Sequence, residues 1–224
     1  MQLEVVVADA AEAVEAQRAG ASRLELVADM DCGGVTPDHK TIDSVTRAVS
    51  IPVHVMIRPH ANGFVYDASA RENILQSASR MRDLGAAAIV FGALDDRRRV
   101  AGQFVKEVLH ASALPMTFHR AFDTAQVLTG AYATLSAIRG VERVLTAGGS
   151  GTAWEGRESL RELGAGNSLP TVTAAGAIDS NNVEELVRYT HLREIHVMSG
   201  ARTNGRVDPQ KIARIAELMN GVSC

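Results

Sequence analysis

The apolar positions of the chain fall into short runs, and each run is followed by a longer segment whose apolar residues have helical spacing. The short runs have the length and β-branched content of buried strands, and they cover residues 3–7, 23–27, 52–58, 87–91, 115–119, 143–146, 171–174 and 194–198. The predicted helices are 9–20, 36–49, 68–84, 103–111, 127–138, 154–163, 181–189 and the stretch from Pro209 onward. Asp9 suits a helix N-cap, Thr36-Pro37 suits a helix start, and Gly20 suits a helix end.

Strict alternation of strand and helix predicts parallel strands joined by right-handed crossovers. The alternation repeats eight times, with about 28 residues per unit, enough for one strand, one helix and two short turns. We therefore predict an α/β fold of the (β/α)8 TIM-barrel type, formed as a single domain by residues 1–224. A doubly wound open sheet is the alternative, but no GxGxxG motif follows the first strand and no change of composition marks a second domain.

Polar side chains recur at one parity of the predicted strands, and the neighbouring positions are mainly aliphatic. Because side chains alternate across a strand, the polar parity should line the barrel interior and the aliphatic parity should face the helices. The predicted inward set is Glu4, Glu25, His54, Arg58, Thr117, His119, Thr146, Thr171, Thr173, Glu194 and His196. The predicted outward set includes Val5, Leu24, Val55, Phe118, Leu145, Val172 and Ile195. Glu4 and Glu194 stand at strand starts, the end of a barrel that serves stability, so we expect structural ion pairs there.

The segment 115–123 brings an imidazole, a guanidinium and a carboxylate to the end of one apolar strand, as His119, Arg120 and Asp123. With Glu25 and Arg58 they form the predicted catalytic cluster, because barrel active sites lie at the C-terminal ends of the strands. Burying such groups unpaired costs several kcal/mol each, so they need partners, solvent or a ligand. Two alternatives stay open: Asp123 can cap the next helix, and Arg120 has the outward parity unless the strand ends before it.

Glycine-rich loops follow the last three predicted strands, at 147–151, 175–177 and 199–202. Glycine lets backbone N–H groups approach a ligand, and this region of many barrels holds a phosphate. The predicted anion site consists of Gly148, Gly149, Gly176, Ser199 and Gly200. Ordinary turns are the alternative. In the loop after the third strand, Phe64 and Tyr66 form either a lid over the same face or a contact with the barrel rim.

Composition narrows the possible functions. A net charge of −3 without a basic block argues against nucleic-acid binding, and no apolar run approaches the ~18 residues of a membrane span. The start of the chain has no signal-peptide pattern, and two cysteines do not suggest a disulfide framework, so we expect a cytoplasmic protein. None of the three lysines stands at the C-terminal end of a strand, which argues against Schiff-base aldolase chemistry.

Several motifs, in order along nearly the whole chain, resemble the CutC copper-homeostasis family. They are Arg23-x-Glu25-Leu26, Gly33-Gly34-x-Thr36-Pro37, Pro52-x-His54, Ile57-Arg58-Pro59, His119-Arg120-Ala121-Phe122-Asp123 and Arg143-Val144-Leu145-Thr146-x-Gly148-Gly149. The resemblance implies a (β/α)8 barrel, a cytoplasmic and commonly dimeric protein, and a role in copper homeostasis or copper binding. The chain departs from the family at Val27, where many members have cysteine, and at His60, where arginine is frequent.

The sequence offers few soft ligands for the copper that the resemblance implies. Cu(I) prefers thiolates and thioethers, and the predicted metal ligand is Cys32, with Met30 and His39 close by in sequence. Cys224 is the last residue, where we expect mobility. A borderline metal inside the barrel is the other option, with ligands from Glu25, His54, His119 and His196. Hydrogen-bond networks are the alternative role for these histidines.

Two functions therefore stay open. The first is a copper-homeostasis protein that binds copper through Cys32. The second is an enzyme acting on a small anionic or phosphorylated metabolite, with Glu25 or His119 as general acid or base. In this enzyme Arg58 and Arg120 would hold a carboxylate or phosphate, and proton transfer, isomerisation and hydrolysis are all open. A non-catalytic barrel that acts through protein partners is a third option.

Overall fold

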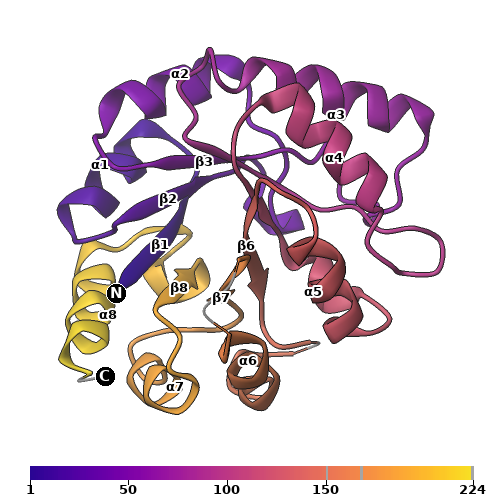
Figure 1. The fold of residues 1–224 in the computed structure, drawn as a ribbon. Helices are drawn as coiled ribbons and strands as arrows, with labels where there is room; N and C mark the ends of the chain where they lie inside the picture. Colours follow the sequence, from indigo (N-terminus) through magenta and orange to yellow (C-terminus); the bar gives the residue numbers. More distant parts are fainter. Residues whose placement is uncertain (150, 167–168, 223–224) are drawn as a thin grey trace.

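The computed structural model describes residues 1–149, 151–166 and 169–222, and in these ranges eight parallel strands close into a barrel surrounded by helices (Figure 1). The barrel strands are β1 Gln2–Val7, β2 Arg23–Leu26, β3 Val53–Met56, β4 Ala88–Phe91, β5 Met116–Phe118, β6 Val141–Thr146, β7 Thr171–Ala174 and β8 Glu194–Val197. The helices are α1 Ala10–Arg18, α2 His39–Ala48, α3 Ala68–Arg80, α4 Gly102–Ser112, α5 Leu128–Ser136, α6 Arg157–Gly164, α7 Val183–Thr190 and α8 Pro209–Gly221.

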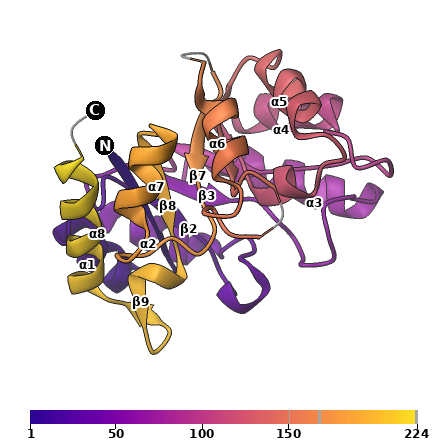
Figure 2. The ribbon, with the colours of Figure 1, turned by 90° about the horizontal axis from the view of Figure 1, so that it is seen from below.

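Strand β1 pairs with both β2 and β8, which closes the sheet and leaves no open edge. Helices α8 and α1 are in contact, so the last β/α unit meets the first (Figures 1 and 2). Three 3-10 turns, Met30–Cys32, Arg120–Thr124 and Ser199–Ala201, follow β2, β5 and β8, and a small hairpin of β9 Arg202–Thr203 and β10 Arg206–Val207 precedes α8. The predicted (β/α)8 barrel is confirmed.

The second helix begins later than the sequence pattern predicts. Asp9 caps α1 as expected, but α2 starts after Asp38, whose side chain accepts a hydrogen bond from the amide of Thr41 at 2.9 Å. Thr36 therefore does not open the helix. Its hydroxyl oxygen accepts a hydrogen bond from the amide of Arg58 at 2.8 Å, which ties the loop after β2 to the end of β3.

Strand β6 differs from the prediction in which side chains face inward. Leu145 lines the cavity inside the barrel, so its neighbour Thr146 must face the other way. The expectation that Thr146 faces inward and Leu145 outward is wrong. The pairing of β5 with β6 shifts register between Met116 and Thr117. A one-residue shift exchanges the two faces of a strand, so the polar pattern alone could not assign them.

The interior of the barrel contains a buried set of ion pairs. Arg23 lies between two carboxylates, with its Nε 2.5 Å from Glu4 Oε2 and its Nη2 2.8 Å from Glu194 Oε2. Arg143 approaches the same oxygen of Glu194 with its Nε at 3.1 Å. The two carboxylates thus have the structural ion pairs expected of them. The two arginines were missed by sequence reasoning, although each stands two residues before another inward-facing position.

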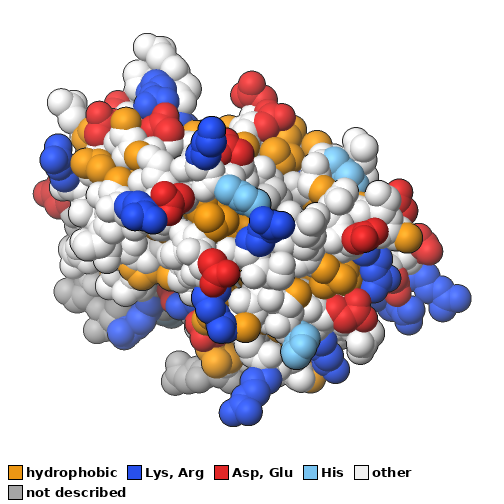
Figure 3. Space-filling model, turned by 90° about the horizontal axis from the view of Figure 1, so that it is seen from above, with side chains coloured by type: hydrophobic (Ala, Val, Ile, Leu, Met, Phe, Trp, Pro, Cys, Tyr) orange, Lys and Arg blue, Asp and Glu red, His pale blue; other side chains and the backbone are white. Residues whose placement is uncertain are grey.

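The surface carries mixed charge. On the face drawn in Figure 3, basic and acidic side chains are interspersed, and no broad area of a single sign is visible. Across the described residues, the helices are all too short or too polar to cross a lipid bilayer.

We predict that Arg23→Met lowers the free energy of unfolding by about 3–5 kcal/mol, because it leaves the fully buried carboxylate of Glu4 without its cation. Urea unfolding at pH 7 measures this difference. The matched control is Arg18→Met at the exposed end of α1, which should change stability by less than about 0.5 kcal/mol. Equal effects of the two substitutions would contradict a structural role for the ion pair.

Candidate functional site

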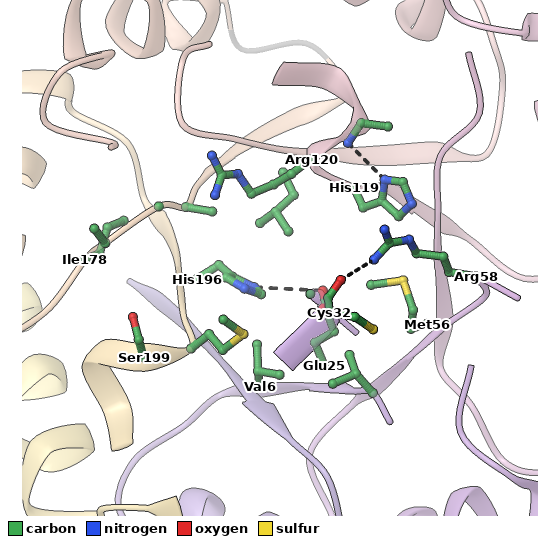
Figure 4. A pocket seen from close by; sticks show the side chains of 18 of the residues that line it. Val6, Glu25, Cys32, Met56, Arg58, His119, Arg120, Ile178, His196 and Ser199 are labelled. Carbon is green, nitrogen blue, oxygen red and sulfur yellow. Dashed lines mark hydrogen bonds and ion pairs between the residues drawn. The ribbon is translucent and has the colours of Figure 1, made fainter. Parts of the chain in front are cut away.

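A cavity of about 320 Å³ lies at the C-terminal ends of the strands. Side chains from β2, β3 and β8 and from the segment after β5 converge on it, and Figure 4 shows Glu25, Arg58, His119 and His196 around the same space. Aliphatic side chains from β1 and β6, the backbone after β7, and residues of the loops after β2, β3 and β8 also contribute to the lining. The closed barrel therefore brings together four residues of the predicted cluster, Glu25, Arg58, His119 and Arg120.

Glu25 points inward from β2 and is 4% exposed. Its Oε2 atom is buried, and no described residue forms a hydrogen bond with it. Burial removes water from the carboxylate and raises the pKa of Glu25 to about 7, although the nearby His196 acts in the opposite direction. A carboxyl group that titrates near neutral pH can both give and take a proton there.

His196 links Glu25 to the ion pairs inside the barrel. Its Nδ1 is 2.7 Å from Glu4 Oε1 and 3.9 Å from Glu25 Oε2. Burial lowers the pKa of His196, but the carboxylates of Glu25 and Glu4 outweigh burial and raise it above the usual value. Burial likewise opposes ionisation of Glu4, yet Arg23 and His196 hold the pKa of Glu4 far below its usual range. Sequence reasoning placed His196 in the inward set and in the alternative interior metal site, but not in the predicted catalytic cluster.

His119 follows β5 and is 4% exposed. Its Nδ1 accepts a hydrogen bond from the amide of Ala121 at 3.1 Å, while its Nε2 is buried without a partner among the described residues. Burial, with the charge of Arg58 beside it, lowers the pKa of His119 to about 3, so the ring is neutral at pH 7. Gly92 makes room for it, since a Cβ there would lie 2.5 Å from the imidazole.

Arg58 is 8% exposed and holds two loops in place. Its Nη1 donates to the carbonyl oxygens of Cys32 at 3.1 Å and Gly34 at 3.0 Å, and its Nη2 donates to that of Ala61 at 3.4 Å. The guanidinium lies over the ring of Phe64 at 5.2 Å. Its buried Nε–H has no acceptor in the described chain. Three of the five guanidinium N–H groups of Arg58 are thus used, and the buried Nε–H is among those left for a ligand.

Arg120 and Asp123 belong to the 3-10 turn after β5. The strand ends at Phe118, so the alternation of inward and outward side chains no longer applies at Arg120. Arg120 lines the cavity. Its Nε donates to Asp123 Oδ2 at 2.7 Å. Asp123 itself lies behind the cavity wall, where it accepts hydrogen bonds from the hydroxyl of Thr146 and the amide of Ala147. It does not cap α5, whose N-cap position is occupied by Val127.

The predicted anion-site residues divide into two groups. Gly176 and Ser199 line the cavity, whereas Gly148, Gly149 and Gly200 do not. The amide of Gly148 donates to Thr146 Oγ1 at 2.9 Å and that of Gly149 to Asp123 Oδ1 at 3.3 Å. Gly200 packs closely against the carbonyl oxygen of Ile178. Ser150 in the same loops and the terminal Cys224 lie outside the described residues. The anion site itself stays a prediction.

Cys32 lines the cavity and is half-buried, with its Sγ donating to the carbonyl oxygen of Asp29 at 3.1 Å. Met30 packs instead against a small apolar cluster inside the barrel, and His39 lies at the exposed start of α2. The sulfur-bearing side chains that line the cavity with Cys32 are those of Met56 and Met198. Thioethers are among the soft ligands that Cu(I) prefers.

Among the described His, Cys, Asp and Glu side chains, those of Glu4, Glu25 and His196 form the one group of three whose ligand atoms lie within 4.8 Å of one another. It lacks the His54 and His119 of the predicted interior metal site. Arg23 and His196 already pair with Glu4, so a metal ion there would displace existing contacts.

The aromatic residues of the loop after β3 have separate roles. Phe64 lines the cavity, and its ring centroid is 5.0 Å from that of His119. Tyr66 stacks on Phe91 at 6.2 Å between ring centroids, which is the packing alternative to a lid.

These features define a TIM-barrel protein whose pocket, lined by both ionisable and apolar side chains, lies at the face where barrel proteins carry out chemistry. Residues 1–201 match the profile of the CutC family, and the chain belongs to this family. A CutC protein of Enterobacter sp. (strain 638) is 34% identical over 202 residues, 90% of this chain and 81% of that protein. One from Xanthomonas campestris pv. campestris (strain B100) is 36% identical over 203 residues, 88% of this chain and 82% of that one.

Two solved structures illustrate the breadth of the fold. A CutC protein from Streptococcus agalactiae, named as a candidate copper homeostasis protein, has a TM-score of 0.83 at 24% identity, covering 88% of this chain and 97% of that one. N-(5'-phosphoribosyl)anthranilate isomerase from Pyrococcus furiosus has a TM-score of 0.70 at 14% identity, covering 99% and 100%. At these identities the likeness shows the fold alone.

We predict that Glu25 makes stability depend on pH between 4.5 and 7. Its pKa of about 7 in the folded state exceeds the unfolded value of 4.5, so its stabilising effect is complete below pH 4.5 and is lost as pH rises through 7. Relative to Glu25→Gln, the wild type should lose about 3 kcal/mol of unfolding free energy between pH 4.5 and pH 8. Urea unfolding at both pH values measures this.

The raised pKa of His196 acts with the same sign, and because Glu25 contributes to raising it, the comparison with Glu25→Gln measures the pH dependence of Glu25 together with its effect on His196. Glu15→Gln, at an exposed position of α1, is the control and should keep the pH dependence of the wild type. A difference between wild type and Glu25→Gln that stays constant with pH would refute the raised pKa.

Proposed function

We propose that this CutC-family protein is an enzyme that binds a small anionic metabolite in the cavity and transfers a proton with Glu25. One observation carries the proposal: a buried carboxyl group with an unpartnered oxygen and a pKa of about 7 lines the cavity. Structural carboxylates are normally held ionised by their partners, as Glu4 is. Glu25 instead lies between its two protonation states at neutral pH, which suits a general acid or base.

The charge of the cavity supports an anionic substrate. Arg58 and Arg120 both line it, and Arg120, with its side chain 42% exposed, can reach an incoming ligand. Gly176 and Ser199 also line the cavity. The position after β7 and β8 matches the place where many barrels hold a phosphate, and this supports an anionic group there.

We predict that the protein incorporates solvent deuterium into its substrate and that Glu25→Gln lowers the rate at least about 100-fold, because the amide cannot accept the proton. The protein is incubated in D2O with small phosphate esters and carboxylates, and a mass increase of one unit is followed by mass spectrometry. Glu15→Gln is the matched control and should retain the wild-type rate. Exchange that persists unchanged in Glu25→Gln would refute the role of Glu25.

A second candidate function is handling of Cu(I) as cargo, which we propose on the sulfur-bearing side chains of the same cavity. Cys32, Met56 and Met198 all line it, and one thiolate with two thioethers matches the ligand preference of Cu(I). The related Streptococcus agalactiae protein is named for copper homeostasis, and this name is the reason to consider copper as cargo. The homodimer and the cytoplasmic location that the family implies stay predictions.

If copper is the cargo, the protein should bind one equivalent of Cu(I) in competition with a chromogenic chelator, and Cys32→Ser should abolish this binding by removing the thiolate. Met81→Leu is the control, because Met81 is fully buried in the main core, away from the cavity. Weak binding, or binding that Cys32→Ser does not change, would exclude Cys32 as a copper ligand.

A further inference from the structure

We propose that His119 and Arg58 form an oxyanion-binding pair on the cavity wall and that the substrate is a carbonyl compound with an acidic C–H bond beside the carbonyl group. The inference rests on the proposed proton-transfer function and specifies its substrate class. It comes from three buried polar atoms that lack hydrogen-bond partners in the described chain and belong to residues lining one cavity: His119 Nε2, Arg58 Nε and Glu25 Oε2, the last of which lies 3.9 Å from His196 Nδ1.

The tautomer of His119 follows from its backbone contact. Nδ1 lies 3.1 Å from the amide nitrogen of Ala121, and a backbone N–H can only donate, so Nδ1 carries no proton. Burial and the charge of Arg58 keep the ring neutral. The single ring proton is therefore on Nε2, which makes this atom a hydrogen-bond donor. A buried donor without an acceptor costs free energy, and a ligand oxygen would supply the missing acceptor.

Arg58 supplies a second donor of the same kind. Its terminal nitrogens hold the loop carbonyl groups, and its Nε–H is left over. Phe64 lies beside both side chains, with its ring centroid 5.0 Å from that of the His119 imidazole and 5.2 Å from the guanidinium carbon of Arg58. Both donor atoms are buried, and an apolar ring beside them lowers the local dielectric constant, so hydrogen bonds to developing negative charge become stronger.

The imidazole is fixed in position before a ligand arrives. The amide of Ala121 holds one edge of the ring, and the missing side chain of Gly92 leaves the space that the ring fills. Because the ring does not reorient during a reaction, its Nε2–H stabilises a charge that develops on the substrate. A neutral donor suits a carbonyl oxygen that becomes negative better than a phosphate, whose permanent charge fits the exposed guanidinium of Arg120.

The step that this arrangement supports is enolisation. The Glu25 carboxylate takes a proton from the carbon beside the carbonyl group, the C–H electron pair becomes the new C=C bond, and the carbonyl π pair moves onto oxygen. The resulting enolate oxygen accepts hydrogen bonds from His119 Nε2–H and Arg58 Nε–H, and His119 keeps its proton. Protonated Glu25 then returns a proton to carbon, so the step needs no oxidant or cofactor. In D2O the returned proton is a deuteron.

The first test measures the tautomer of His119 and the binding of a ligand that mimics the enolate. Two-bond ¹H–¹⁵N spectra at pH 7 should show His119 in the Nε2-protonated neutral form, assigned by its absence in His119→Phe. Oxalate, a planar dianion that resembles an enolate, should bind and shift the Nε2 proton signal. His119→Phe should weaken oxalate binding about tenfold or more, whereas His119→Gln, which keeps an amide donor near Nε2, should stay within about threefold. His110→Phe, on the exposed face of α4, is the control.

The second test uses deuterium exchange with matched pairs, namely dihydroxyacetone phosphate against glycerol 3-phosphate and pyruvate against lactate. We expect exchange only beside a carbonyl group, and we expect His119→Phe to slow it about 100-fold or more. Gly92→Ala, which displaces the ring without removing it, should slow exchange less. Thermal unfolding confirms that each variant is folded.

The outcomes separate this inference from the proposed function. Exchange that depends on Glu25 but not on His119 overturns the oxyanion pair and leaves the proton-transfer function standing. Oxalate binding that depends on His119, without exchange in any of the four compounds, supports the oxyanion pair and counts against proton transfer. Neither exchange nor oxalate binding overturns both, and a His119 ring protonated on Nδ1 overturns the inference by itself.

Discussion

The contact between Glu4 and Arg23 is the interaction on which the other polar groups inside the barrel depend. Both side chains are buried, so neither charge can be solvated and each must be compensated by the other. With Glu4 held ionised, its second oxygen binds His196, and His196 in turn lies beside Glu25. The position and charge of the groups at the cavity floor thus follow from a pair of residues deeper in the barrel.

Burial favours the neutral form of both Glu25 and His119. Loss of water disfavours the charged form of both, which raises the pKa of the carboxyl group and lowers that of the imidazole. His119 is neutral throughout the physiological range, whereas Glu25 has a pKa of about 7 and the neighbouring His196 has a raised pKa. The cavity therefore combines a proton acceptor with a fixed neutral donor, a division of roles that mutual ion pairing would have prevented.

The candidate site could be predicted in part, because barrel topology brings the ends of all strands to one face. Inward strand parity, together with the position of Arg58 and His119 at the ends of predicted strands, predicts that Glu25, Arg58 and His119 lie there, and the structure brings them together. Which donors of Arg58 are occupied could not be predicted, because its partners are backbone carbonyls of another loop. The assignment of Leu145 and Thr146 failed for a related reason: the register shift beside β6 arises from pairing with β5.

The sequence by itself determined the barrel, because the alternation of apolar runs and helical segments is a local property that each unit expresses independently. It also determined which strands carry polar inward residues. Only the tertiary structure decided which polar atoms stay without partners, such as His119 Nε2 and Glu25 Oε2. That property depends on how closely residues remote in sequence approach one another, such as Gly92 and the His119 ring, and these approaches are fixed only when the barrel closes.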